Sequence, residues 1–227
     1  MTRWMNRLRA WRLSRRARRH ARVGRPELWA MKRKFQIDFL RSAGLQPHHT
    51  LLDVGCGTLR GGIPIIAYLQ PGHYYGVERR AEVLAEGRRE LEESNLTDRQ
   101  PTLIVADRLG DLTLPVAFDF IWAFSVLIHM TDEALADGLQ LVQRALKPTG
   151  AFYANVKIGE EEEGHWQGFP VVSRPLSFYR EQAARFGLSV EDVGSLASLG
   201  HHSGIESQDR QRMLRFSLVR CGTETSG

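Results

Sequence analysis

The sequence predicts an α/β protein with a mostly parallel sheet wound by helices on both faces. Strand-like apolar segments alternate with helical segments five times between residues 51 and 156. The segment Phe118–Ser125 is nearly all apolar, as expected for a central strand that is buried on both faces. Leu51–Val54 leads directly into a glycine-rich turn, and doubly wound sheets bind ligands at such turns. The chain of 227 residues is long enough for one such domain with additions.

Composition predicts a globular cytoplasmic protein. Apolar residues make up 42% of the chain and charged residues 25%, which are ordinary values for such proteins. No apolar run approaches the ~20 residues needed to span a bilayer, and the start of the chain lacks the apolar core of a signal peptide. The two cysteines, Cys56 and Cys221, lie in the glycine turn and near the end. This placement argues against a disulfide framework and a structural zinc site, so we expect no metal.

Positive charge is concentrated at the N-terminus. Ten of the 31 basic residues are arginines in residues 1–25, so 21 basic residues oppose 26 acidic ones in the rest of the chain. Trp4, Trp11 and their apolar neighbours fall on one side of a helix, with arginines on much of the other. Three interpretations remain open: a solvated, partly disordered tail, a helix lying on an anionic membrane surface that makes the protein peripheral, or contact with RNA or another polyanion.

Arg25-Pro26 marks a boundary, because proline favours the first turn of a helix. We therefore divide the chain into a basic segment (residues 1–25), one domain (26–222) and a frayed polar tail (223–227). The predicted helices are Glu27–Ala43, Ile63–Leu69, Ala81–Ser94, a segment capped by Thr131 that runs to Leu146, and Ser177–Phe186. The predicted strands after Leu51–Val54 are Tyr74–Glu78, Pro101–Asp107, Phe118–Ser125, Ala151–Val156, Leu188–Val193 and Met213–Val219, and Lys147–Gly150 is a predicted turn.

Two segments have no clear regular pattern. Gly159–Pro175 contains a run of four glutamates at 160–163 and then His165-Trp166, and a loop of this length is typical of a lid or a binding segment. The glutamates themselves favour a solvated face. Gly200–Gly204 is a loop of small residues and histidines between the last two strands.

Acidic residues at three strand ends predict a nucleotide-like ligand that also carries positive charge. Gly55 and Gly57 let a ligand approach the backbone, and Asp53 suits a cationic group beside them. Glu78 follows Asp53 by 25 residues, the length of one strand–helix–strand unit, and can accept hydrogen bonds from ribose hydroxyls. Asp107 can receive the amine of an adenine. Two other nucleotide-binding motifs do not fit the sequence. Arg60 stands where the dinucleotide fingerprint needs its third glycine, and the Gly-Lys-Ser/Thr of a P-loop does not follow.

These residues resemble the motifs of the class I S-adenosylmethionine-dependent methyltransferases. Leu51-Leu-Asp-Val-Gly-Cys-Gly57 is similar to motif I, and Phe118 to His129 to the motif IV region. Leu59-Arg-Gly-Gly62 is similar to the Leu-Arg-Gly-Gly segment that follows motif I in a bacterial subgroup of this family. The family implies a Rossmann-like, seven-stranded sheet with an antiparallel last strand, and S-adenosyl-L-methionine as cofactor. The residues expected to bind that cofactor are Asp53, Gly55, Cys56, Gly57, Arg60, Glu78, Arg79, Asp107, Arg108, Phe124 and Ser125.

The methyl acceptor is narrowed by what the chain lacks. The Asp/Asn-Pro-Pro-Tyr tetrad of amino-methyltransferases is absent after the fourth strand, and no Pro-Cys pair is placed to attack a pyrimidine. We expect methylation of a small molecule or a sugar, with oxygen preferred and nitrogen left open. Oxygen methylation needs a base, and His129 is the first candidate, with His201 or His202 as alternatives. An RNA methyltransferase recruited by the basic segment, and a non-catalytic cofactor-binding or interaction protein, are the competing hypotheses.

Overall fold

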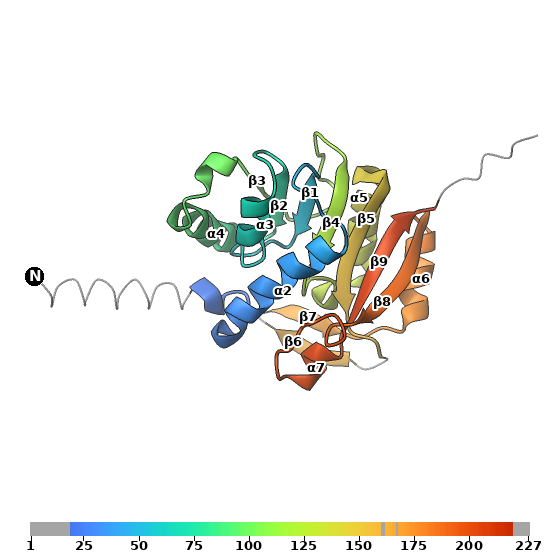
Figure 1. The fold of residues 1–227 in the computed structure, drawn as a ribbon. Helices are drawn as coiled ribbons and strands as arrows, with labels where there is room; N and C mark the ends of the chain where they lie inside the picture. Colours follow the sequence, from blue (N-terminus) through green and yellow to red (C-terminus); the bar gives the residue numbers. More distant parts are fainter. Residues whose placement is uncertain (1–18, 160–161, 167, 220–227) are drawn as a thin grey trace, which may run out of the picture.

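The fold is an α/β sandwich around one seven-stranded sheet, as predicted (Figure 1). The computed structural model describes residues 19–159, 162–166 and 168–219. The strand order is β3-β2-β1-β4-β5-β9-β8; strands β1 to β5 pair in parallel, and β9 is antiparallel to both of its neighbours. The strands are β1 (Leu51–Val54), β2 (Tyr74–Glu78), β3 (Thr102–Val105), β4 (Phe118–Ala123), β5 (Leu146–Val156), β8 (Leu188–Ser195) and β9 (Arg212–Leu218).

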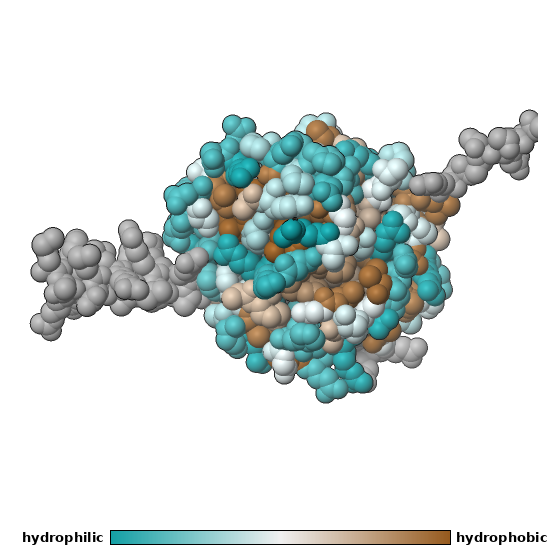
Figure 2. All heavy atoms as spheres, viewed as in Figure 1, coloured by the Kyte–Doolittle hydropathy of each residue, from teal (hydrophilic) through white to brown (hydrophobic). Residues whose placement is uncertain are grey.

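Helices cover both faces of the sheet because alternate strand residues point to opposite sides. Leu51 belongs to the core under the first helices and Leu52 to the core on the other face, and both side chains are fully buried. The first face carries α2 (Trp29–Ser42), α3 (Gly62–Tyr68) and α4 (Ala81–Glu93), and the second carries α5 (Asp132–Ala145) and α6 (Leu176–Ala184). Figure 2, in the same view, shows hydrophobic residues reaching the surface among hydrophilic ones beside α2.

The register of the central strands collects the predicted site residues at one edge of the sheet. Strand order reverses at β1, with β2 on one side and β4 on the other. Val54 of β1 pairs with Val77 of β2, and Asp53 pairs with Trp122 of β4. The glycine turn, Glu78 and the residues after β4 therefore emerge together, and ligands of doubly wound sheets bind at this switch point.

Local signals set several boundaries as predicted, but the start of β5 was predicted wrongly. The Thr131 hydroxyl caps α5 by accepting the Ala134 N–H at 3.3 Å. The predicted turn Lys147–Gly150 belongs to β5, which begins at Leu146. Lys147 reaches the carboxylate of Asp119 at 2.8 Å, and this contact holds the stretch against β4, where the register shifts.

Gly159–Pro175 is more ordered than predicted. It contains the hairpin β6 (Glu162–Trp166) and β7 (Phe169–Val172), with Gly168 between the strands at a φ of +83°. A short helix, α7 (Glu206–Asp209), also follows the histidine loop and was not predicted. The hairpin and α7 lie together at one end of the sheet (Figure 1).

Some predictions concern residues that the structure does not describe. The tryptophan–arginine face of residues 1–18, the glutamate side chains of 160–163 and the tail from residue 220 lie outside the described ranges. Among the helices within those ranges, none has the length and apolar character that crossing a bilayer requires.

Candidate active site

Two adjoining cavities open at the strand ends, with volumes of about 600 and 440 Å³. Gly55, Glu78, Ser125 and His129 line both, so the two cavities form one elongated site. All the predicted site residues line it except His202. The larger cavity takes Asp53, Cys56, Gly57, Arg60, Phe124 and His201, and the smaller takes Arg79, Asp107 and Arg108.

Glu78 is held in place at the junction of the two cavities. Only 5% of the residue is exposed. One carboxylate oxygen accepts the Gly57 N–H at 3.0 Å, and the other accepts the Arg80 N–H at 3.1 Å and its Nε–H at 3.0 Å. A carboxylate has about four acceptor positions, so lone pairs remain for the hydroxyls of a sugar.

Asp53 has an environment that favours a cationic ligand. The Tyr74 hydroxyl donates a hydrogen bond to its carboxylate at 2.6 Å. Burial raises the pKa of Asp53 to about 7, and the Tyr74 hydrogen bond and the positive charge of Arg60 only partly oppose that rise. A cation bound beside Asp53 would favour the ionised carboxylate.

Close packing explains the Arg60-Gly61-Gly62 sequence. A Cβ at Gly61 would lie 2.2 Å from Oε1 of Gln36 on α2, and a Cβ at Gly62 would lie 2.6 Å from the Tyr74 hydroxyl oxygen. Gln36 also accepts a hydrogen bond from the indole N–H of Trp122 at 3.0 Å. The two glycines therefore let α2 and Tyr74 pack closely against the segment that follows the glycine turn.

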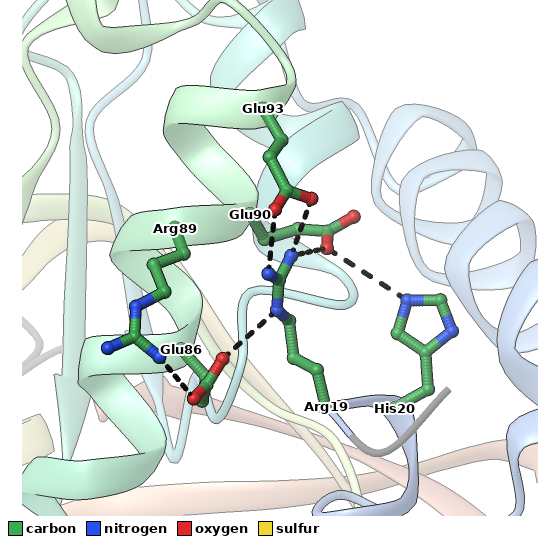
Figure 3. A network of polar contacts seen from close by, with 6 residues as sticks. All are labelled: Arg19, His20, Glu86, Arg89, Glu90 and Glu93. Carbon is green, nitrogen blue, oxygen red and sulfur yellow. Dashed lines mark hydrogen bonds and ion pairs between the residues drawn. The ribbon is translucent and has the colours of Figure 1, made fainter. Parts of the chain in front are cut away.

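Residues 19–28, here called the N-terminal strap, are fastened to α4. The Arg19 guanidinium lies among three glutamates of that helix, bonding Glu90 at 2.6 Å, Glu93 at 2.9 Å and Glu86 at 3.2 Å (Figure 3). Arg19 is 4% exposed and the Glu90 side chain is fully buried. These hydrogen bonds and charges raise the pKa of Arg19, so it stays charged.

The strap forms one wall of the larger cavity. The Val23 carbonyl accepts a hydrogen bond from Arg60 at 2.8 Å, and a Cβ at Gly57 would lie 2.8 Å from a Val23 methyl group. Gly57 has a φ of +58°, which glycine adopts without strain. Four residues of the predicted basic segment, Ala21, Val23, Gly24 and Arg25, line this cavity.

His129 lies at the junction of the cavities, beneath the β6–β7 hairpin. Its Nδ1 lies 2.9 Å from the Pro170 carbonyl, so Nδ1 carries the proton and Nε2 keeps the free lone pair. The ring stacks on Trp166 at 5.2 Å between centroids. Burial lowers the pKa of His129, which favours the neutral imidazole.

His201 is held by a carboxylate but sealed in the wall. Its Nδ1 lies 2.8 Å from Asp209 of α7, and its ring packs edge-on against Phe35 at 5.1 Å. Nε2 is buried without a hydrogen-bond partner. Burial also lowers the pKa of His201. His129 is therefore the histidine better placed to meet a ligand in this conformation.

The smaller cavity is bounded by exposed charged groups. The Asp107 side chain is 88% exposed and lies 3.9 Å from Arg79, and Arg108 bonds Asp137 on α5 at 3.0 Å.

Cys56, in the larger cavity, is buried. Burial raises the pKa of its thiol, so the thiol does not ionise readily to a reactive thiolate. Residues that were not among the predicted site residues also line the site; they are Lys32, Gln36, Arg80, Lys157, Val126, Leu109, Trp166, Phe169 and Gln208.

The charges of the larger cavity fit the amino-acid part of S-adenosylmethionine. Asp53 and Arg60 present opposite charges to an amino-acid group, and the buried Arg60 Nε has no hydrogen-bond partner. A Cβ at Gly55 would lie 2.5 Å from a Val126 methyl group. Glycine at this position therefore lets the turn pack closely against Val126 beside the cavity. No cluster of metal-ligating side chains occurs among the described residues.

Residues 52–152 match a family model described as a methyltransferase domain. The fold is also that of solved methyltransferases. Magnesium protoporphyrin IX methyltransferase from Synechocystis PCC 6803 with bound SAM has a TM-score of 0.65 at 16% identity, covering 91% of this chain and 90% of that one. The glycopeptide N-methyltransferase MtfA has a TM-score of 0.63 at 17% identity, covering 82% and 90%.

An S-adenosylmethionine-dependent methyltransferase from Clostridium acetobutylicum has the same fold, with a TM-score of 0.64 at 13% identity over 85% of this chain and 92% of that one. The matched residues 52–152 contain the glycine turn, Glu78 and Asp107. The domain match and the cradle built by those residues lead to one conclusion: the chain contains a methyltransferase domain, and the cofactor of that domain is S-adenosylmethionine.

Proposed function

We propose that the enzyme methylates a small molecule, at oxygen, inside the larger cavity. The observation that carries this proposal is the junction at Glu78 and His129. A cofactor whose ribose is bound at Glu78 would place its adenine in the smaller cavity beside Asp107 and its amino-acid part beside Asp53 and Arg60. The rest of the larger cavity is then left for the acceptor.

The walls of the larger cavity favour a small acceptor. They come from the strap, α2, the β6–β7 hairpin and the segment around α7. A volume of about 600 Å³, shared with part of the cofactor, is in the range of small-molecule sites. The sulfonium of the bound cofactor supplies an activated methyl group. The protein's part is to orient the acceptor, exclude water and accept a proton.

We assign the proton-accepting role to His129. Its Nδ1 is directed to the Pro170 carbonyl, which orients Nε2, and its lowered pKa keeps the ring neutral near pH 7. A base in this position would take the proton from an acceptor hydroxyl as the methyl group is transferred. General-base catalysis of this kind contributes about 10²–10⁴-fold to a rate.

Replacing His129 by glutamine tests the assignment. We expect methyl transfer from labelled cofactor to an extract of small molecules to fall at least about a hundredfold at pH 7, while affinity for S-adenosylhomocysteine stays within about threefold of wild type. His165→Gln, which changes an exposed histidine of the hairpin, is the matched control. A variant at His129 that keeps the full rate and the wild-type pH profile would exclude His129 as the base and favour nitrogen methylation.

A further inference from the structure

Positive charge is concentrated on the wall of the larger cavity. Arg25, Lys32, Arg60, Arg80 and Lys157 line it, against two carboxylates, those of Asp53 and Glu78. Arg80 is paired with Glu78 at 3.0 Å, and Arg25 is largely exposed and lies 4.0 Å from Glu27. The buried cations of this wall are Arg60 and Lys32, each 8% exposed.

Lys32 carries a buried amine that forms no ion pair with a carboxylate of the described residues. Within the described ranges, no carboxylate lies within 4.0 Å of its Nζ, and Nζ has no hydrogen-bond acceptor. The charge of Asp209 acts on Lys32, but the Asp209 carboxylate is already bonded to His201 and Ser203. Burial and then the charge of Arg60 lower the pKa of Lys32 to about 7. An unpaired buried cation is costly, and a bound anion removes the cost.

The cofactor does not account for both cations. Its amino-acid part carries one carboxylate and one ammonium. Arg60 and Asp53 already present a cation and an anion to these two groups. The charge of Arg60 lowers the pKa of Asp53, and the charge of Asp53 raises the pKa of Arg60. Lys32 comes from α2, opposite the glycine turn, on the part of the wall that also includes His201.

We propose that Lys32 binds an anionic group of the methyl acceptor, so that the acceptor is a small molecule bearing a carboxylate or a phosphate. The inference rests on the proposed function, because it names the class of molecule that shares the cavity with the cofactor. The ammonium of Lys32 forms an ion pair with the acceptor anion, which orients the acceptor hydroxyl toward the junction at His129. Binding an anion there also raises the fraction of Lys32 that is charged at neutral pH.

The test uses Lys32→Met, which keeps an unbranched side chain one atom shorter and removes the charge. Lys34→Met is the control, because Lys34 lies on the same helix with 77% of its side chain exposed. Lys32→Arg restores the charge. Extracted small molecules are separated by ion exchange into anionic, neutral and cationic pools, and each pool is incubated with enzyme and labelled cofactor. We expect label in the anionic pool, a loss of at least tenfold in Lys32→Met, and partial recovery in Lys32→Arg.

A binding measurement keeps the test independent of turnover. Benzoate and its neutral counterpart benzamide are titrated calorimetrically into the enzyme saturated with S-adenosylhomocysteine. We expect benzoate to bind at least tenfold more tightly than benzamide to wild type and to Lys34→Met, and with no preference to Lys32→Met. If no pool becomes labelled but benzoate is still preferred over benzamide, the result counts against the proposed methyl transfer. The anion site at Lys32 remains supported in that case. Equal binding of the two probes, label confined to the neutral or cationic pools, or an equal loss of S-adenosylhomocysteine affinity in Lys32→Met would overturn the inference.

Discussion

The two halves of the active site are built in different ways. The cofactor half takes its polar groups from the ends of adjacent strands, with Asp53 on β1 and Glu78 on β2. The acceptor half takes them from the strap, from Lys32 on α2, from the β6–β7 hairpin and from the segment around α7. The carboxyl ends of neighbouring parallel strands always lie at the same edge of a sheet. The polar groups of the acceptor half come together only through tertiary packing. We therefore propose that the polar groups of the cofactor half hold the common methyl donor and that those of the acceptor half determine which acceptor binds.

The largest effect should come from Glu78, the residue that joins the halves. Two hydrogen bonds from ribose hydroxyls to a carboxylate are worth about 1.5–3 kcal/mol each, so Glu78→Ala should weaken S-adenosylhomocysteine binding by a hundredfold or more. Calorimetry measures this directly, and Glu82→Ala, an exposed glutamate of α4, is the control. Unchanged affinity in Glu78→Ala would remove the cofactor from this half of the site.

Arg19 tests whether the strap belongs to the acceptor half. Removing it takes away the charge-assisted hydrogen bond that the fully buried Glu90 accepts at 2.6 Å. Breaking such a pair costs about 3–5 kcal/mol when both groups are buried, and we expect about 2–3 kcal/mol for Arg19→Ala because Glu93 is half exposed. Denaturant unfolding measures the loss, with Arg22→Ala as the exposed control.

A loosened strap should also change how the acceptor binds, because Val23 and Gly24 line the cavity. We expect Arg19→Ala to raise the KM for the acceptor more than it weakens S-adenosylhomocysteine binding. An equal effect on both ligands would make the strap a common lid rather than an acceptor wall.

Asp53 gives the cofactor half a pH dependence. Its pKa in the folded protein is raised to about 7 from an ordinary 3.8, so the folded protein keeps a proton that the unfolded chain releases. The contribution of Asp53 to stability therefore falls as pH rises through this window. A cationic group of the cofactor needs the ionised form, so S-adenosylhomocysteine affinity should rise by up to about tenfold per pH unit below pH 7 and then level off. Calorimetry of Asp53→Asn from pH 5.5 to 8 should show weaker binding without that slope.

The same contrast shows how much the sequence could predict. Glu78 was recognised because a strand–helix–strand unit has a characteristic length, and the antiparallel last strand was implied by the resemblance to a known family. Lys32 was not singled out, because its burial depends on how α2 docks through Gln36 on Gly61. The sequence around Gln36 contains no local pattern that predicts its contact with Gly61.

The packing of the strap and the two strands of the hairpin were not predicted, for a related reason. Arg19 lies in a run of arginines for which we considered a solvated tail, a membrane surface or a polyanion. It is instead buried among three glutamates 67 to 74 residues away along the chain. The hairpin lacks a strong alternating pattern, and its place over His129 depends on the contact to Pro170. Long-range pairings of this kind are visible only once the chain has folded.

The most direct test is a crystal structure of the enzyme with S-adenosylhomocysteine. We predict that the ribose hydroxyls lie on the carboxylate of Glu78, with the adenine beside Asp107 and the amino-acid part between Asp53 and Arg60. The sulfur should then face the space bounded by His129 and Lys32. A ligand bound away from Glu78, or one whose amino-acid carboxylate is held by Lys32, would contradict the division of the site into a cofactor half and an acceptor half.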